Sequence, residues 1–351
     1  MPTIDDINKY VICGEHEVNY TTTYAASDAW GALSAQSFID IERFKRNLHV
    51  EVLSETEESL SFDLIGVDVS FANALRRILL SEIATMAVEH VVVLNNTSVI
   101  PDEVLAHRLG LIPLLVDAKL FEEVDPSVPV EALNGKQTLK FVLNVACPGK
   151  DKSKDPDDVT DEADLYINGR VFSKDFKWVP IDDQIDWIHA APRPVLDDIL
   201  ISKLRTGQTI SVEMYATKGV GATHAKWSPV STAFYSLMPA PRIKRRVSGV
   251  EAENLRQVCP LKVLDIEDGE LVVSNPRACT TCRECIRQQP KVPSDSPVEL
   301  RKIRDHFMFT VESSGVLPAR EILIRALDVL IGKCDELSDC INQLASATFA
   351  S

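Results

Sequence analysis

The sequence predicts an α+β protein of about two domains, since 351 residues compare with roughly 150 residues per domain. Three observations support this class. Strand-like alternation of apolar and polar residues recurs along the chain, an apolar stripe of helical period begins near residue 70, and another lies near the end of the chain. The apolar fraction of 45% is typical of soluble globular proteins and sufficient for a large core.

The charge and the cysteine content narrow the class of protein. Lys and Arg number 37 against 52 Asp and Glu, a net charge of −15, which argues against direct binding of nucleic acid or of an anionic membrane. No apolar run approaches the roughly 18 residues of a membrane span, and the start of the chain shows no secretory signal. The eight cysteines are therefore expected to be reduced thiols or metal ligands.

The first part of the chain is predicted to form an extension, a pair of strands and a helix. Residues 1–46 are mixed and polar, and they predict an extension that lies on other surfaces. Alternation over 48–67 predicts strands. The stretch from Ser70 to about Glu89 predicts a helix with Ser70 as N-cap, because apolar residues recur every three or four positions at Phe71, Ala74, Leu75, Ile78, Leu79, Ile83 and Met86.

Two polar segments interrupt the rest of the chain. Residues 150–164 hold seven carboxylates and predict a solvated loop or insertion. Residues 286–299 contain Pro290, Pro293 and Pro297, which indicates a linker.

The last element, from about Pro318 to Ala347, has a heptad pattern. A helix of this length spans about 45 Å. It packs either within its own domain, which is the commoner case, or against a partner helix, which a strict 3.5-residue period at this position favours. The residues of the seam are spaced 4, 3, 4, 3, 4 and 3 apart: Leu323, Leu327, Leu330, Cys334, Leu337, Ile341 and Leu344.

Four cysteines form a second distinctive element. Cys279, Cys282 and Cys285 have C-x2-C-x2-C spacing, which is typical of iron–sulfur ligation and less so of zinc, and Cys259 is followed by proline as in ferredoxins. Between them, Asp268-Gly269 predicts a two-residue hairpin turn. With this turn, the residue numbers of each cross-strand pair would add up to 537. Extending the same register places Cys259 beside Cys279. The sequence therefore predicts four converging thiols, which hold a metal or remain as reduced, unligated cysteines.

Catalytic motifs are missing from the sequence. GVGATH at 219–224 lacks the last glycine of a dinucleotide loop, and no phosphate-binding loop, nucleophile elbow or H-E-x-x-H motif occurs. The basic cluster Arg242 to Arg246 is an import signal, a partner contact or a solvated loop. We therefore expect a protein that is not itself an enzyme.

Several segments resemble the α-like subunits of cellular RNA polymerases. The helix DVSFANALRRILLSEIATMAVE carries that family's F-x-N-A-L-R-R-x-L signature. LAHRLGLIPL, HAKWSPVSTAFYSLMP, the Cys259–Cys285 segment and SSGVLPAREILIRALDVL are similar to further segments of archaeal and eukaryotic members. Within the family, the length and the N-terminal extension resemble the larger α-like subunit shared by RNA polymerases I and III. The early cysteine-rich zinc loop of the polymerase II counterpart is missing.

The resemblance implies a particular domain arrangement. Residues 47–88 and 226–347 would form a discontinuous RNA polymerase α-like dimerisation domain, after the extension at 1–46. A second domain would be inserted at 89–225, and a small ferredoxin-like insert with the cysteines at 252–297. Cys259, Cys279, Cys282 and Cys285 would be its metal ligands, with a [4Fe–4S] cluster favoured over zinc.

The resemblance also implies partners and a location. The chain would heterodimerise with a smaller α-like subunit and form the platform for the two largest subunits, alongside small zinc-binding subunits, in the nucleus and nucleolus. Arg76 and Arg77 would contact a large subunit. The dimer interface would include the following residues of the two helices: Phe71, Leu75, Ile78, Leu79, Leu323, Leu327, Leu330, Leu337 and Ile341.

Two other classes remain open from the sequence. One is an iron–sulfur electron-transfer subunit, which a single cysteine set and the lack of a flavin or nicotinamide motif weaken. The other is a free homodimeric scaffold, which the oligomeric state of the purified chain would reveal.

Overall fold

The computed structural model describes residues 9–14, 16–21, 41–125, 128–129, 132–150, 165–287 and 296–349. Trp30, Phe38, the carboxylates of 151–164, and Pro290 with Pro293 lie outside these residues. The chain divides into two compact units. The first comprises Met1–Ser54, Ser61–Ala74 and Phe234–Thr310, and the second Glu55–Leu60, Leu75–Ala233 and Val311–Ser351. The domain boundaries expected from the sequence stay predictions.

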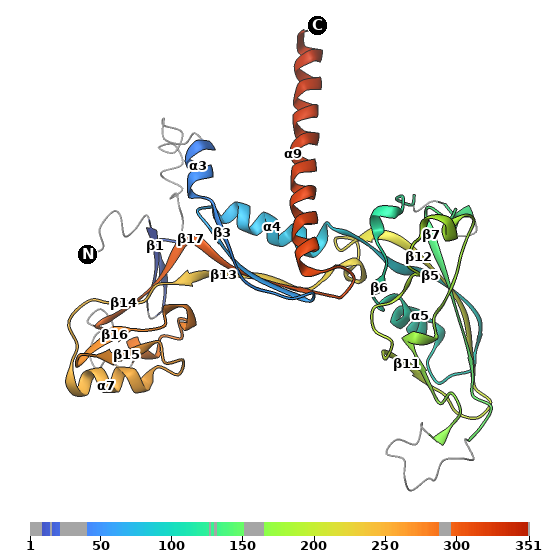
Figure 1. Cartoon of the computed structure of the whole chain (residues 1–351), viewed down its shortest axis with the longest axis horizontal. Coiled ribbons are helices and arrows are strands. Elements are labelled where there is room, and N and C mark those ends of the chain that lie inside the picture. Colours follow the sequence, from blue (N-terminus) through green and yellow to red (C-terminus); the bar gives the residue numbers. More distant parts are fainter. Residues whose placement is uncertain are drawn as a thin grey trace. The chain divides into compact units, whose positions relative to one another are not determined.

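The largest sheet has the long strand β17 (Val298–Ser313) at its centre (Figure 1). Its strand order is β2 (Val18–Asn19), β1 (Tyr10–Cys13), β17, β4 (Ser59–Ile65) and β3 (His49–Glu55). The strands β13 (Val230–Pro239) and β14 (Arg242–Ile243) also pair with β17. Part of the predicted extension thus becomes a strand, since β1 pairs antiparallel with β17 from Tyr10↔Ile303 to Cys13↔Leu300.

The helix α4 (Val69–Ser81) carries the predicted amphipathic stripe but is shorter than predicted. Asp68, rather than Ser70, caps it, because the Asp68 carboxylate accepts the backbone N–H of Ser70 at 2.8 Å and its hydroxyl at 2.6 Å. The predicted end near Glu89 is wrong. The residues from Ala84 onward form the strand β5 (Ala84–Asn96), whose backbone pairs with a neighbouring strand.

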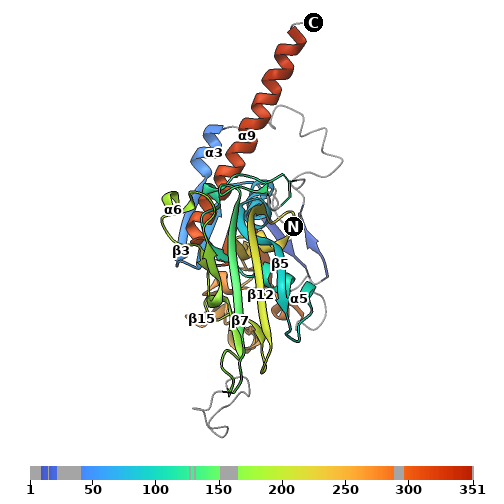
Figure 2. The ribbon, with the colours of Figure 1, turned by 90° about the vertical axis from the view of Figure 1, so that its right-hand side faces the viewer.

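A second sheet has the order β5, β12 (Thr209–Val220), β7 (Thr138–Ala146) and β9 (Lys177–Val179), and its long strands lie side by side in Figure 2. All three pairings are antiparallel. Two short pairs accompany it, β6 (Leu114–Leu115) with β10 (Arg193–Pro194), and β8 (Arg170–Phe172) with β11 (Leu200–Lys203).

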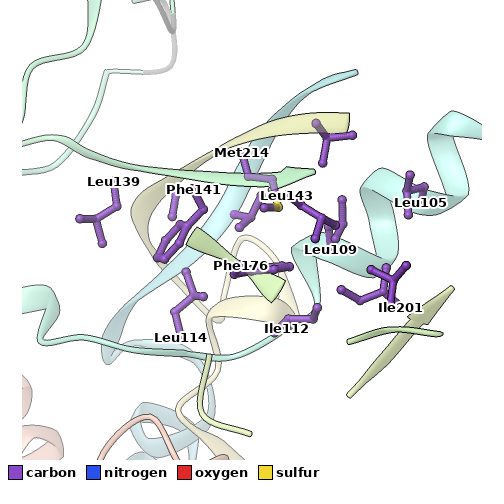
Figure 3. Close-up of a cluster of buried hydrophobic side chains, with 14 of the residues drawn as sticks. Leu105, Leu109, Ile112, Leu114, Leu139, Phe141, Leu143, Phe176, Ile201 and Met214 are labelled. Atoms are coloured by element: carbon purple, nitrogen blue, oxygen red, sulfur yellow. The ribbon is translucent and has the colours of Figure 1, made fainter. Parts of the chain in front are cut away.

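The helix α5 (Asp102–Gly110) packs its buried residues into the core of this second sheet (Figure 3). Leu109, Phe141 and Met214 are fully buried in that core. Short helical elements complete the unit: α6 (Gln184–Trp187), η2 (Ala118–Leu120), η6 (Ser173–Asp175) and η7 (Ala225–Trp227).

The remaining elements include a short helix, the cysteine-bearing segment and the last helix. They are α3 (Ile41–Asn47), α7 (Gly249–Val258), β15 (Leu264–Glu267), β16 (Glu270–Val273), η8 (Pro276–Ala278), α8 (Glu284–Arg287) and α9 (Ala319–Phe349). The mixture of helices and sheets agrees with the predicted α+β class. Among the described residues, no helix is long and apolar enough to span a membrane.

Candidate dimerisation helix and cysteine module

The helix α9 is a single element of 31 residues, about 46 Å long, and it confirms the predicted terminal helix. Its first turns are anchored, because Ala319, Ile322 and Ala326 are fully buried. They lie three and four residues apart and so share one face of the helix. Beyond these turns the helix becomes exposed (Figure 1).

The predicted heptad seam lies largely on the surface of this chain. Leu323 and Leu330 are half-buried, whereas Leu337 and Ile341 are 63% and 57% exposed. Leu327, Cys334 and Leu344 are also exposed. Such a continuous apolar face on a helix is typical of a protein–protein contact.

A buried arginine fixes the base of α9. Arg325 is only 7% exposed, and its guanidinium donates to Asp117 and to Glu321 at 2.9 Å each. Burial alone would raise the pKa of Asp117, but the hydrogen bond from Arg325 holds the pKa of that carboxyl below its usual value. About two turns past Arg325, Lys333 forms an ion pair with Glu82. These ties hold the first half of α9 in a defined direction.

The predicted interface residues of α4 have a different environment. Leu75, Ile78 and Leu79 are at most 2% exposed, so they pack within this chain and leave little surface for a partner. Phe71 is half-buried and its ring meets that of Phe44 edge-on at 6.4 Å.

Of the two arginines predicted to contact a large subunit, Arg77 is exposed and Arg76 is half-buried. The predicted roles of α4 stay predictions.

The hairpin predicted between the cysteines is confirmed. The strands β15 and β16 pair from Leu264↔Val273 to Glu267↔Glu270. The two residue numbers of each pair add up to 537, as expected. Asp268 and Gly269 have φ values of 51° and 78°, which is the left-handed backbone that a type I′ turn requires at both positions.

The four predicted cysteines line one small cavity, together with apolar residues that include Val263 and Leu264. The backbone N–H of Val263 donates to the sulfur of Cys259 at 3.3 Å. Three non-glycine residues next to the cysteines have left-handed φ values, with Lys262 at 51°, Thr281 at 57° and Arg283 at 72°. Since this conformation is costly for residues with a Cβ, the surrounding structure holds these loops in tight turns.

Two thiols of this cavity, those of Cys279 and Cys285, have a raised pKa and favour their protonated form. Burial raises the pKa of Cys285 to about 12, and the neighbouring Cys279, Cys282 and Cys259 add to the increase. Burial likewise raises the pKa of Cys279. Four sulfur donors suit an iron–sulfur cluster or zinc. Within the described ranges, however, no group of three or more His, Cys, Asp or Glu side chains is arranged to hold a metal ion. The metal prediction therefore stays a prediction.

A buried carboxylate connects the cysteine segment to the large sheet. Asp63 of β4 is 2% exposed, and Arg277 of η8 donates to its two oxygens at 2.7 and 2.8 Å. His306 Nε2 of β17 lies 2.8 Å from Asp63. Burial alone would raise the pKa of Asp63, but the bonds from Arg277 and His306 hold it below the usual value. Arg277 stands two positions before Cys279, so this ion-pair clamp fixes the start of the C-x2-C-x2-C loop.

The basic cluster also contacts the cysteine segment. Arg245 donates to Glu251 of α7 at 3.1 Å, and Arg246 forms an ion pair with Glu270 of β16. These pairs are exposed and contribute little stability.

The sequence pattern does not reveal the clamp residues Asp63, Arg277 and His306, nor Arg325. One signal was available, since aspartate at the centre of an apolar strand pattern needs a partner when buried. The partner itself could not be found, because 214 residues separate Asp63 from Arg277.

A central sheet, an anchored helix with an exposed apolar face and a cysteine hairpin define a subunit built for association. The chain belongs to the RNA polymerase Rpb3/Rpb11 dimerisation domain family, whose match covers residues 61–334.

Named relatives support this assignment over nearly the whole chain. One is the DNA-directed RNA polymerases I and III subunit rpac1 of Dictyostelium discoideum, 42% identical over 91% of this chain and 89% of the relative. The subunit of the same name from Mus musculus is 40% identical over 96% of both chains. That of Saccharomyces cerevisiae is 37% identical over 92% of this chain and 97% of the relative.

Proposed function

We propose that this chain is the larger α-like subunit shared by RNA polymerases I and III, a non-catalytic assembly platform. It heterodimerises with the smaller α-like subunit and supports the two largest subunits during transcription of ribosomal and small RNAs, in the nucleus and nucleolus. The observation that carries this proposal is the exposed apolar face of α9 in a chain whose residues 61–334 match a dimerisation domain.

The smaller α-like subunit would cover the distal half of α9. Leu337, Ile341 and Leu344 stand exposed on successive turns, and burying them against partner side chains is favourable by the hydrophobic effect. The ties of Arg325 and Lys333 orient the helix before the partner arrives. Orientation in advance lowers the entropy lost on binding.

The domain arrangement is part of the proposal. The dimerisation domain would comprise 47–88 and 226–347, with a second domain inserted at 89–225 and a ferredoxin-like insert at 252–297. The core formed by β5, β12 and β7, built from residues between Met86 and Ala216, supports an inserted folding unit. The separate apolar cluster around Leu255, Leu264 and Leu271 supports the smaller insert.

The experiment that tests heterodimer formation uses co-expression with the smaller α-like subunit. We expect Leu337→Asp or Leu327→Asp to abolish co-purification, because an aspartate would enter an apolar contact. The control Asn342→Asp places the same charge next to the apolar face without interrupting the heptad. Unchanged co-purification of both leucine variants would contradict the proposal, and so would a stable homodimer of the chain without a partner.

A large-subunit contact at Arg76 and Arg77 is the second component. The exposure of Arg77 and the ability of guanidinium groups to bind carboxylates and carbonyls support it. Reversing both charges should leave the heterodimer intact and weaken assembly with the two largest subunits and the small zinc-binding subunits. The matched control is Arg193→Glu, an exposed arginine on the short strand β10. Normal assembly of the double variant would exclude this contact.

A structural [4Fe–4S] cluster at Cys259, Cys279, Cys282 and Cys285 is the third component. Its support is the C-x2-C-x2-C spacing and the shared cavity. The cluster would supply cross-links between the loops, as structural metals do in small modules. Iron, sulfide and zinc analysis after anaerobic purification tests it. Sub-stoichiometric metal of every kind would leave four reduced thiols, while reversible reduction with visible absorbance would favour an electron-transfer role.

A further inference from the structure

Among the residues that the structure describes, the strand β3 forms an open edge of the large sheet. It is the last strand in the order β2-β1-β17-β4-β3 and has β4 as its neighbour. All seven of its residues, His49–Glu55, are exposed. Val50 and Val52 are 50% and 53% exposed, and Leu53 is 46% exposed.

Such an edge is a template for another strand. The outward N–H and C=O groups of an edge strand are hydrogen-bonded by water alone, and native proteins usually protect them with lysine, proline, a bulge or a covering element. Between Leu48 and Leu60 the sequence contains no proline, lysine or arginine. Exposed aliphatic residues on an unprotected edge favour pairing with an added strand.

The two faces of β3 differ in a way that specifies the occupant. Because side chains alternate along a strand, Glu51 and Glu55 share one face with Leu53, and Val50 and Val52 share the other. The turn that follows adds Glu57 and Glu58, both exposed. A strand that complements β3 in charge and hydrophobicity therefore has cationic residues on one face and aliphatic residues on the other.

A second copy of this chain fits this edge poorly. In antiparallel self-pairing centred on Leu53, Glu51 would lie opposite Glu55. Centred on Glu51, that carboxylate would lie opposite its own copy, and centred on Val52 the two Glu51 side chains would lie diagonally across. Like charges at directly opposite positions destabilise a strand pair, and diagonal neighbours are within reach of long side chains.

We propose that the free edge of β3 pairs with an extended strand of another polypeptide in which lysine or arginine alternates with β-branched or aliphatic residues. The end of this edge adjoins the base of α9. Ala319 donates its N–H to the carbonyl of Glu57 at 2.9 Å, and Arg320 lies 3.6 Å from Glu55. The Arg320 pair is exposed and therefore weak, so Glu55 remains available to an incoming cation. The edge and its charges do not depend on the proposed function.

The test uses the full chain, co-expressed with its partner where solubility requires it. The probe is a labelled peptide of sequence Lys-Val-Lys-Val-Lys-Val-Thr with blocked ends, and its matched control has glutamate in place of each lysine. We expect the lysine peptide to bind at least about tenfold more tightly, since reversing several cross-strand charges changes affinity by about that factor or more. Hydrogen exchange should slow at residues 49–55 and not along α9.

Variants of the chain locate the contact. Glu51→Lys combined with Glu55→Lys should reverse the preference between the two peptides, whereas Asp197→Lys with Asp198→Lys, at exposed positions elsewhere, should leave it unchanged. Equal affinity for both peptides, protection outside 49–55, or an unaltered preference in the Glu51/Glu55 variant would overturn the proposal. Self-association that is relieved by Val52→Lys would also overturn it, because a second copy would then be the occupant.

Discussion

The sheet of β5, β12 and β7 and the cysteine segment 249–287 are stabilised in different ways. The sheet has a continuous apolar core with fully buried large residues such as Phe141, Leu143 and Met214 (Figure 3). The core around the cysteine segment contains leucine, valine, isoleucine and cysteine, and no aromatic residue occurs between Tyr235 and Phe307. The ion-pair clamp of Asp63, Arg277 and His306 ties it to β4 and β17.

Because of this difference, a change in pH, redox state or metal content can alter the stability of one region and not of the other. Apolar burial depends little on pH or redox state, so the sheet should remain folded over a wide range of both. A buried carboxylate and a cluster of thiols respond to protonation, oxidation and metal. The stability of the cysteine segment is therefore expected to depend on pH, redox state and metal.

The largest effect is expected in the apolar core. Phe141→Ala should lower the free energy of unfolding by about 3–5 kcal/mol, because a fully buried phenylalanine leaves a cavity. Hydrogen exchange of the β7 and β12 amides measures the loss. The control Phe234→Ala, at a position 52% exposed, should change it by less than about 0.5 kcal/mol. Equal effects of the two changes would mean that this core does not dominate the stability of the sheet.

A smaller effect is expected in the ion-pair clamp. Asp63→Ala should destabilise the cysteine segment by about 2–3 kcal/mol. This is less than the usual cost of breaking a fully buried ion pair, because the partly exposed Arg277 can turn to solvent. Asp63→Asn keeps the volume and should retain part of the contact. Exchange of the amides at 264–278, compared with those of β12, measures the effect. A uniform loss in both regions would contradict a local clamp.

The pH dependence of the clamp has a defined sign. Because the pKa of folded Asp63 lies below its ordinary value of 3.8, the contribution is fully present above that value. It is lost as pH falls through the lower pKa of the folded state. Acid titration followed by exchange at 264–278 should show loosening of the wild type at pH values below 3.8, and Asp63→Asn should not show this step.

The smallest effect is expected at Cys282 if the thiols are unligated. Cys282 is exposed, so Cys282→Ser should then cost less than about 0.5 kcal/mol. With a cluster bound, the same change removes a ligand and should loosen 252–297 and reduce assembly. Cys340→Ser, an exposed cysteine of α9, is the matched control. The two results distinguish four free thiols from a ligated site without measuring metal directly.

Local patterns were sufficient for several elements. The heptad spacing predicted α9, since helical period is a property of neighbouring residues. Asp268-Gly269 predicted the hairpin and its register, because few residue pairs tolerate two consecutive left-handed positions. The same register brought Cys259 toward Cys279, and the two do line one cavity. The signature helix indicated the family, and the family match over residues 61–334 confirms it.

Other features depended on contacts between distant residues. The end of α4 at Ser81 could not be read from periodicity, because Ile83 and Met86 are apolar at positions that suit both a longer helix and a buried strand. Pairing of β5 with β12, from Val220↔Ala84 onward, decides between them.

The sequence alone thus determined the helices and turns that depend on near neighbours, together with the family. Tertiary structure decided which apolar stripes are covered. Leu79 is fully buried and Leu337 is 63% exposed, although both occupy an apolar stripe of similar period. Tertiary structure also brought Arg277 to Asp63 and Arg325 to Asp117. The physical reason is that burial and ion pairing depend on the residues that fold next to a side chain, and these lie far away in the sequence.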